Sequence, residues 1–191
     1  MTMQDLMIDL ETFSTRNDAA IVSIGAVFFN RETGEMGPTF YRLVDNPSGH
    51  IDPNTVRWWL QQSEEARGAL NDVKGRYAER AALESLGRFI EERSHVTKCI
   101  WANDPDFDLT ILQSAYERND MRLPWSFRKA RSMRTMIDIS TTFGLALEPV
   151  RGGTHHNALD DAIHQAKGII SIWDALSDRM SAASNLDDLC R

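Results

Sequence analysis

Residues 6–11 have the sequence LMIDLE, an apolar strand pattern that is interrupted by two acids. Two further extended segments follow at 20–30 (AIVSIGAVFFN) and 38–45 (PTFYRLVD). Short polar turn sequences separate the three segments, at lengths that suit antiparallel hairpins. This part of the chain therefore predicts a meander of three antiparallel strands.

The rest of the chain alternates between helix and strand patterns. We expect helices after Asp52-Pro53, through TVRWWLQQSEEARGAL, and then at 78–93, 108–118 and 156–176, with a loop at 68–76. Short apolar runs predict buried strands at 98–103 and 136–140. A meander followed by alternation predicts an α/β fold, with a mixed five-stranded sheet of three antiparallel and two parallel strands flanked by helices.

Length and composition favour one domain. The chain has 191 residues, 42% of them hydrophobic and 26% charged, close to the averages for globular proteins. We expect a domain over 1–178 and a loose tail over 179–191. No apolar run approaches the roughly 20 residues of a membrane span, and the N-terminus lacks the basic residues of a secretory signal. The expected location is the cytoplasm, without membrane contact.

The net charge of −7 argues at first against nucleic-acid binding, because phosphate contacts normally come with a basic surface. The objection weakens if carboxylates hold divalent cations, since these ions bring positive charge to the place where phosphate must lie. The chain also has one basic cluster, formed by Arg128, Lys129, Arg131 and Arg134. It is a candidate for phosphate contacts, with a solvated charge run as the equal alternative.

Asp9 and Glu11 are the first unusual acids. They lie two residues apart in a predicted strand, so both side chains point to the same face of the sheet. A solvated face is the simple explanation for such a pair. Two like charges on a central strand are nevertheless costly, and a bound cation would be a reason to keep them.

A second group of acids, Asp104, Asp106 and Asp108, follows the predicted strand at 98–103. Helix capping accounts for Asp104 or Asp106. It accounts less well for Asp108, which lies between two apolar residues and should face the core. Ligands in α/β proteins gather at the carboxyl ends of strands, which makes Asp108 a candidate site residue.

The third group is HHNALDDA at 155–162, after a Gly-Gly turn. A His followed five residues later by an Asp fits two registers equally, His155 with Asp160 or His156 with Asp161. Ordinary capping at a helix start is the alternative to either.

Taken together, the three groups supply hard oxygen ligands with a His beside them. Carboxylate oxygens without a Cys or His cluster favour Mg²⁺ or Mn²⁺ over structural zinc. Two such ions would clamp a phosphodiester, one activating water and the other stabilising the leaving oxygen. A neutral imidazole is suited to deprotonating that water near neutral pH.

These residues form three motifs: DLETF at 9–13, N-x-x-x-F-D at 103–108 and HNALDDA at 156–162. In order and separation they resemble the three exonuclease motifs of the DEDDh family, which has a ribonuclease H-like fold. The resemblance implies a 3′-to-5′ exonuclease that releases 5′-mononucleotides. It assigns the metal ligands to Asp9, Glu11, Asp108 and Asp161, and the general base to His156.

The resemblance also implies the partners of the site. Thr12 and Phe13 match positions that touch the terminal nucleotide, and Asn103 belongs to the second motif. The expected substrate is single-stranded nucleic acid with a free 3′ end, RNA or DNA, and a homodimer is the expected assembly. More closely, the chain resembles phage and prophage enzymes related to the Rv2179c-like exoribonuclease group. Asp104-Pro105-Asp106 replaces the small residues of those relatives, which puts the fit of the substrate in question.

An adjacent pair of tryptophans, Trp58 and Trp59, offers a stacking surface for bases. Neighbouring helix residues point about 100° apart, so we expect at most one of them to contact substrate. Trp59 is the candidate, together with Arg134 for phosphate, although the helical period leaves Trp58 open. Two rival functions are a phosphodiesterase for very short oligonucleotides and a catalytically silent nucleic-acid-binding module.

Overall fold

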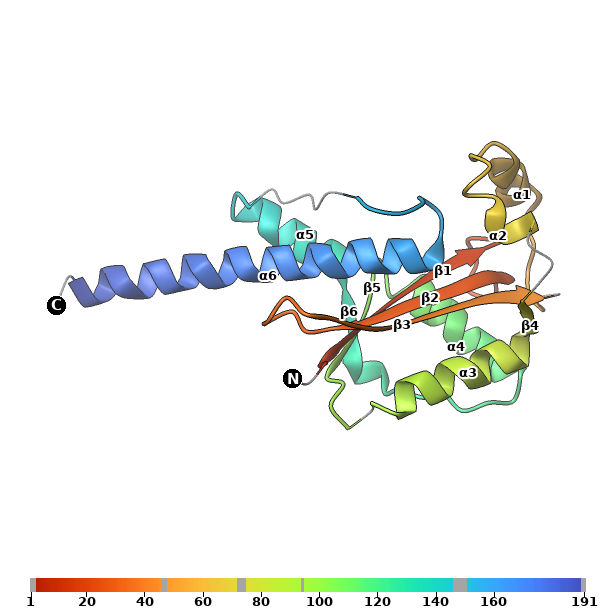
Figure 1. Ribbon diagram of the computed structural model, residues 1–191, viewed down its shortest axis with the longest axis horizontal. Coiled ribbons are helices and arrows are strands. Elements are labelled where there is room, and N and C mark those ends of the chain that lie inside the picture. Colours follow the sequence, from red (N-terminus) through yellow and green to blue (C-terminus); the bar gives the residue numbers. More distant parts are fainter. Residues whose placement is uncertain (1–2, 46–47, 72–74, 94, 146–150, 190–191) are drawn as a thin grey trace.

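The computed structural model describes residues 3–45, 48–71, 75–93, 95–145 and 151–189, with side chains as far as residue 182. Within these ranges a six-stranded sheet is flanked by helices on both faces (Figure 1). The fold is α/β, as expected. No helix in the described ranges is long and apolar enough to cross a membrane.

The sheet has the strand order β4-β3-β2-β1-β5-β6. Its strands are β1 (Asp5–Thr12), β2 (Ile21–Phe29), β3 (Met36–Asp45), β4 (Arg76–Ala78), β5 (Cys99–Ala102) and β6 (Ala130–Ser132). The first three form the predicted antiparallel meander. The other three strands pair in parallel, β4 with β3, β5 with β1 and β6 with β5.

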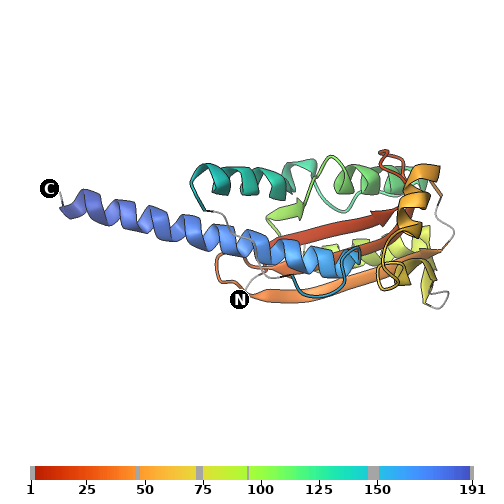
Figure 2. The ribbon, with the colours of Figure 1, turned by 90° about the horizontal axis from the view of Figure 1, so that it is seen from above.

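Two helical layers cover the sheet. The helices are α1 (Pro53–Leu60), α2 (Gly68–Asn71), α3 (Glu79–Glu91), α4 (Asp108–Arg118), α5 (Met133–Thr142) and α6 (Ala158–Leu189), with one 3₁₀ turn at Phe127–Lys129. Figures 1 and 2 show α3 and α4 on one face and α5 and α6 on the other, while α1 and α2 lie beyond the end of β1.

Successive side chains of β1 point alternately toward the two helical layers. Leu6, Ile8 and Leu10 pack in the core with α3 and α4, whereas Met7 packs with residues of α5 and α6. Asp9 and Glu11 have the same parity as Met7. Their side chains therefore belong to the face that α6 covers.

The expected strand at 136–140 is wrong, because these residues lie in α5. Met133 and Ser140 are buried and Met136 packs against the same core, a spacing of three and four residues that fits a helix. Ser132 caps this helix by accepting a hydrogen bond from the Thr135 N–H. The parallel strand that pairs with β5 is instead β6, six residues earlier in the chain.

Other expectations need smaller corrections. The sheet gains β4 and so has six strands instead of five. The helix expected through TVRWWLQQSEEARGAL is interrupted, since α1 ends at Leu60 and α2 begins at Gly68. Helix α6 continues past residue 176 to Leu189, through the segment expected as a loose tail, and extends beyond the sheet (Figure 2).

One glycine allows α6 to lie on the sheet. Gly25 in β2 is the register partner of Asp9 in β1. A Cβ added at Gly25 would lie 2.1 Å from the carbonyl carbon of Ala158 and 2.3 Å from the nitrogen of Leu159. Because these are backbone atoms, no side-chain movement relieves the overlap. The first turn of α6 can therefore lie this close to the sheet, beside Asp9 of β1, only because residue 25 of β2 is a glycine.

Gly25→Ala should destabilise the protein by about 3 kcal/mol or more, because overpacking against backbone forces α6 away from the sheet. Gly68→Ala is the matched control, since a Cβ there meets nothing within 4 Å. Urea denaturation of both variants measures the effect. An unfolding midpoint for Gly25→Ala equal to that of the parent would contradict the packing argument.

Candidate active site

Three carboxylates meet where β1 passes under the start of α6. One oxygen each of Asp9, Glu11 and Asp161 lie within 4.8 Å of one another, and all three residues are buried or nearly so. Strand alternation brings Asp9 and Glu11 to the same face, and the first turn of α6 adds Asp161. The arrangement joins residues from opposite ends of the chain.

Asp108 enters the site from the start of α4. Strand β5 pairs with β1 only as far as Met7, so beyond that point no strand of the described residues pairs with β1 on this side. Asp108 takes that place, because its Oδ1 accepts a hydrogen bond of 3.1 Å from the Leu10 N–H. The Asp108 residue is 3% exposed, and its partner Leu10 lies between Asp9 and Glu11 in β1. The bond therefore fixes the Asp108 carboxylate beside the strand that carries the other two acids.

Burial and the charges of neighbouring acids raise the pKa values of Asp9, Glu11 and Asp108. Burial raises the pKa of Asp9 well above its usual value, and the charges of Asp108 and Glu11 raise it further. The pKa of Glu11 rises to about 8 through burial and the nearby Asp161 and Asp108. Burial also raises the pKa of Asp108 to about 7. A divalent cation would reverse this penalty, since it favours the ionised carboxylates.

Gln165 and Arg151 contact two of these carboxylates. The Gln165 amide donates a 2.6 Å hydrogen bond to Asp9 Oδ1, while its own Oε1 is buried without a partner among the described residues. Arg151 forms an ion pair with Asp161. The sequence motifs did not indicate either residue. The signal for Gln165 is its spacing of one helical turn from Asp161, which places both on the same face of α6.

His156 lies beside Asp161 in a left-handed backbone conformation, with φ of 64°. This conformation directs its backbone N–H to Asp161 Oδ2 at 3.0 Å. Asp160, the acid of the other register, accepts the Thr154 N–H at 2.8 Å and so caps the loop. The structure thus brings Asp161, and not Asp160, to the carboxylates of β1.

Aromatic rings surround the imidazole of His156. The ring of His155 stacks on it at 3.8 Å between centroids, and the ring of Trp58 meets it edge-on at 4.7 Å. Burial, together with the charge of His155, lowers the pKa of His156. The imidazole is therefore neutral at neutral pH and can accept a proton.

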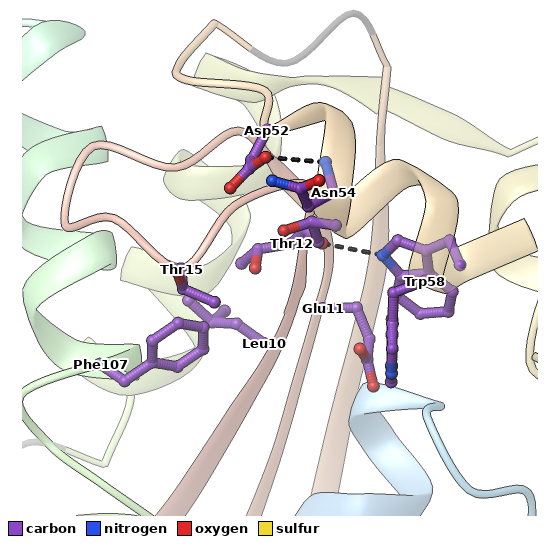
Figure 3. A pocket seen from close by; sticks show the side chains of 10 residues that line it. Leu10, Glu11, Thr12, Thr15, Asp52, Asn54, Trp58 and Phe107 are labelled. Carbon is purple, nitrogen blue, oxygen red and sulfur yellow. Dashed lines mark hydrogen bonds between the residues drawn. The ribbon is translucent and has the colours of Figure 1, made fainter.

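A cavity of about 480 Å³ opens beside Glu11 (Figure 3). Figure 3 shows Trp58 beside the Glu11 carboxylate on one side and Leu10 with Phe107 on the other. Thr12 lines this cavity too, as do Asp52 and Asn54 at the start of α1. Its walls are mainly apolar with a few polar groups, the usual composition of a small-molecule pocket.

A second cavity of about 340 Å³ lies on the other side of Leu10 and Phe107, which line both. It is bounded by Asp9 and Asp108 and contains the predicted contacts Asn103 and Arg134. Three of the four carboxylates thus line a cavity, Glu11 the first and Asp9 and Asp108 the second.

Phe13 and Trp59 are placed differently from the other predicted contacts. Phe13 packs against Val22, Leu43 and Ala69, and does not line either cavity. Trp59 lines the first cavity but is 1% exposed, and its indole N–H donates to the Thr12 carbonyl at 2.9 Å. Its neighbour Trp58 is 39% exposed. Of the two tryptophans, Trp58 thus offers the accessible ring.

A family model covers most of the chain. Residues 4–173 match the family described as the 3′-5′ exoribonuclease Rv2179c-like domain. No curated protein sequence matches the chain.

Solved structures share the fold at low sequence identity. The nuclease domain of 3′hExo, a DEDDh family member bound to rAMP, has a TM-score of 0.63 at 12% identity, covering 90% of this chain and 92% of its own. Exonuclease X in complex with 5′ overhanging duplex DNA has a TM-score of 0.56 at 17% identity, with the same coverage of both chains. Zinc-bound E. coli exonuclease I in complex with single-stranded DNA has a TM-score of 0.62 at 16% identity and covers 94% of this chain. The match spans 41% of that longer protein.

A divalent cation should stabilise the fold, and more so at higher pH. The folded pKa values of Glu11 and Asp108, about 8 and about 7, exceed their usual values. At pH values between the usual and the raised pKa values, the unfolded chain binds fewer protons than the folded protein. The stability of the metal-free protein therefore falls as pH rises from about 4.5 to about 8. Because the ion binds the deprotonated acids, Mn²⁺ should raise the melting temperature more at pH 8 than at pH 5.5.

Thermal melts at both pH values, with Mn²⁺ or a chelator, measure this difference. Asp9→Asn combined with Glu11→Gln is the control, because it removes two ligand charges and should abolish the gain. An equal gain at both pH values, or a gain that persists in the double variant, would contradict cation binding by these acids.

Proposed function

Because the chain belongs to the Rv2179c-like 3′-5′ exoribonuclease domain family, we propose that it removes nucleotides successively from the 3′ end of single-stranded nucleic acid. Each hydrolysis would release a 5′-mononucleotide. The observation that supports this proposal is the convergence of Asp9, Glu11 and Asp161, with Asp108 and His156 beside them, next to two cavities that Glu11, Asp9 and Asp108 line.

The donor set fits Mg²⁺ or Mn²⁺. Asp9, Glu11, Asp108 and Asp161 offer only carboxylate oxygens, the ligands that these hard cations prefer. The raised pKa values of Asp9, Glu11 and Asp108 reflect an acidic cluster in which Arg151 is the cation paired with a ligand among the described residues. We propose two ions per site, which when bound would polarise the phosphodiester and stabilise the developing charge.

His156 is the proposed general base. Its neutral imidazole would take the proton of the attacking water, and its lowered pKa keeps it neutral for that role. The His155 and Trp58 rings fix its orientation, and the backbone bond to Asp161 keeps it beside the ligands. The proposed metal ligand Asp161 and the proposed base His156 thus belong to one short segment, residues 156–161.

The terminal nucleoside would occupy the first cavity. We propose that Trp58 stacks on it, in place of Trp59, whose buried ring supports the backbone of Thr12. Leu10 and Phe107 would bound it on the other side, and Asp52 and Asn54 offer polar atoms to its sugar or base. The nucleotide contact expected of the Phe13 ring has no support from its packing.

The proposal covers both RNA and DNA as substrates. The family description names an exoribonuclease, while the structural neighbours are bound to rAMP in one case and to DNA in another. Hydrolysis of very short oligonucleotides is the second candidate, favoured by the small size of the first cavity. A cytoplasmic location, a homodimer and a closer likeness to phage enzymes stay expectations from the sequence.

His156→Ala should lower kcat by about 10²- to 10⁴-fold, because general-base catalysis contributes that much. Release of the terminal mononucleotide from a 3′-labelled single strand, in Mg²⁺ or Mn²⁺, measures the rate. The Mn²⁺-induced rise in melting temperature should survive, since the carboxylates remain. Asp161→Asn should lose both the activity and the rise.

His155→Ala is the control for this experiment. It removes the ring that stacks on His156 but leaves the proposed base in place, so its loss should be far smaller. A loss as large as that of His156→Ala would reverse the assignment of the base. An active Asp161→Asn variant would contradict the exonuclease site itself.

The two tryptophans should respond to substitution in opposite ways. Trp58→Ala should lower kcat/KM by about 5- to 150-fold, the value of one base stack of about 1 to 3 kcal/mol, with little change in melting temperature. Trp59→Ala should destabilise the fold by about 3 to 5 kcal/mol, because its ring is buried. Steady-state kinetics and thermal melts of both variants test this. Full activity of Trp58→Ala would exclude it as the stacking residue.

A further inference from the structure

Residues 121–137 contain four arginines and one lysine but no acid, in a chain with a net charge of −7. The structure places them along one edge of the sheet, from the 3₁₀ turn at Phe127–Lys129 through β6 to the start of α5 (Figure 1). Strand β6 is the outermost strand on this side. This edge therefore carries five basic residues in a segment without an acid, although the molecule as a whole is acidic.

Strand register connects this edge to the active site. Arg131 of β6 pairs with Trp101 of β5, which pairs with Met7 of β1. All three strands are parallel, so β6 runs toward the same end of the sheet as Asp9. Met7 lies two residues before Asp9, which places Arg131 roughly 7 Å behind the site along the strand direction. Arg134 lies beyond the end of β6 and lines the second cavity, beside Asp9 and Asp108.

The side chains along this edge are exposed and suited to a polyanion. The Arg134 side chain is 67% exposed, with its Nε 3.8 Å from an Asp104 oxygen. Arg131 is exposed and directs one guanidinium nitrogen to the carbonyls of Arg128 and Ala130, at 2.9 and 2.7 Å. A guanidinium has five N–H donors, so most remain for another acceptor.

At the far end of the edge lies an exposed aromatic ring. Phe127 is 75% exposed, and the guanidinium of Arg128 lies over it, 5.3 Å from the ring centroid. An exposed ring next to arginines can stack with a base while the cations contact phosphate. The edge thus combines both features of a surface that binds single strands without reading their sequence.

We propose that this basic edge, formed by Phe127, Arg128, Arg131 and Arg134, holds the single-stranded substrate on the 5′ side of the scissile bond. The inference rests on the proposed function, in which the terminal nucleoside fills the first cavity. That cavity is bounded by Trp58 and Trp59 of α1. The remaining strand then leaves through the second cavity, where Arg134 begins the basic edge.

The proposal predicts a dependence on substrate length. A trinucleotide would reach Arg134 but not Arg131, whose guanidinium is turned back toward Arg128, nor Arg128 or Phe127, whereas a 20-nucleotide strand would extend along the whole edge. Substitutions at the far end should therefore weaken the binding of the long substrate and spare the short one. They should also reduce the salt dependence of binding, by about 0.7 in the log–log slope for each phosphate that an arginine no longer neutralises.

The experiment compares the parent with the triple variant Phe127→Ala, Arg128→Ala, Arg131→Ala. KM is measured for trinucleotides and 20-mers of RNA and DNA at several salt concentrations. The KM for 20-mers should rise about tenfold or more, and the KM for trinucleotides should stay within about twofold, with kcat unchanged. Arg88→Ala is the control, because Arg88 is an exposed arginine on α3, outside both cavities. It should leave both KM values unchanged.

Three results would overturn the proposal: an equal rise in KM for both lengths, no rise for 20-mers, or an equal effect of Arg88→Ala. A change in molecular mass of the triple variant by light scattering would also overturn it, since the edge would then be covered by a second copy. Failure of the proposed function would look different, because the parent would release no nucleotide from either length. Fluorescence anisotropy of a labelled 20-mer would still test the edge, since the triple variant should lose affinity and Arg88→Ala should not.

Discussion

The contact between the first turn of α6 and the glycine of β2 determines where the acids of the site can meet. Gly25 stands opposite Asp9 in the sheet, and the backbone of Ala158 occupies the space that any side chain there would need. From this contact, the first turns of α6 carry Asp161 to Glu11 and Gln165 to Asp9. Two segments at opposite ends of the chain thereby form one site.

The buried acids of this protein differ in the partners of their carboxylates. Asp5, at the start of β1, is 1% exposed and is paired with Arg31 and with the indole N–H of Trp101. Glu79 is likewise buried against Arg118, Ser48 and Asn119. Asp9 and Glu11 lie on the same strand as Asp5, yet their nearest charged neighbours are mainly other acids. Among the described residues, Asp5 and Glu79 are thus each paired with an arginine, whereas Asp9 and Glu11 form no ion pair, a pattern that favours the proposal that they bind a cation.

The sequence predicts much of this arrangement because the motifs lie on regular elements. Alternation places Asp9 and Glu11 on one face, and the end of a buried strand marks the region of Asp108. Spacing could not choose between Asp160 and Asp161, because the choice depends on the left-handed conformation of His156. The family resemblance made that choice in advance. The apolar run at 136–140 predicts a strand but lies in the helix at 133–142, because a run this short does not distinguish a buried strand from a segment of a buried helix.

Other features depend on contacts that a single sequence does not specify. Trp58 and Trp59 are adjacent and chemically identical, and only the placement of α1 makes one accessible and the other buried. Gly25 resembles any other glycine in a strand until the approach of Ala158 is seen. The cavities on either side of Leu10 and Phe107 bring together residues from separate elements, so no local pattern indicates them.

Both outer strands of the sheet, β4 and β6, are only three residues long. Outer strands expose unpaired backbone groups, to which a strand from another molecule could add and begin aggregation. Short length limits this exposure, and a charge such as that of Arg131 opposes the close packing of a second sheet. The arginines along β6 would therefore protect the protein from self-association whenever no polyanion covers them, so that the charges of the proposed binding edge would also keep the outer strand from pairing with another molecule.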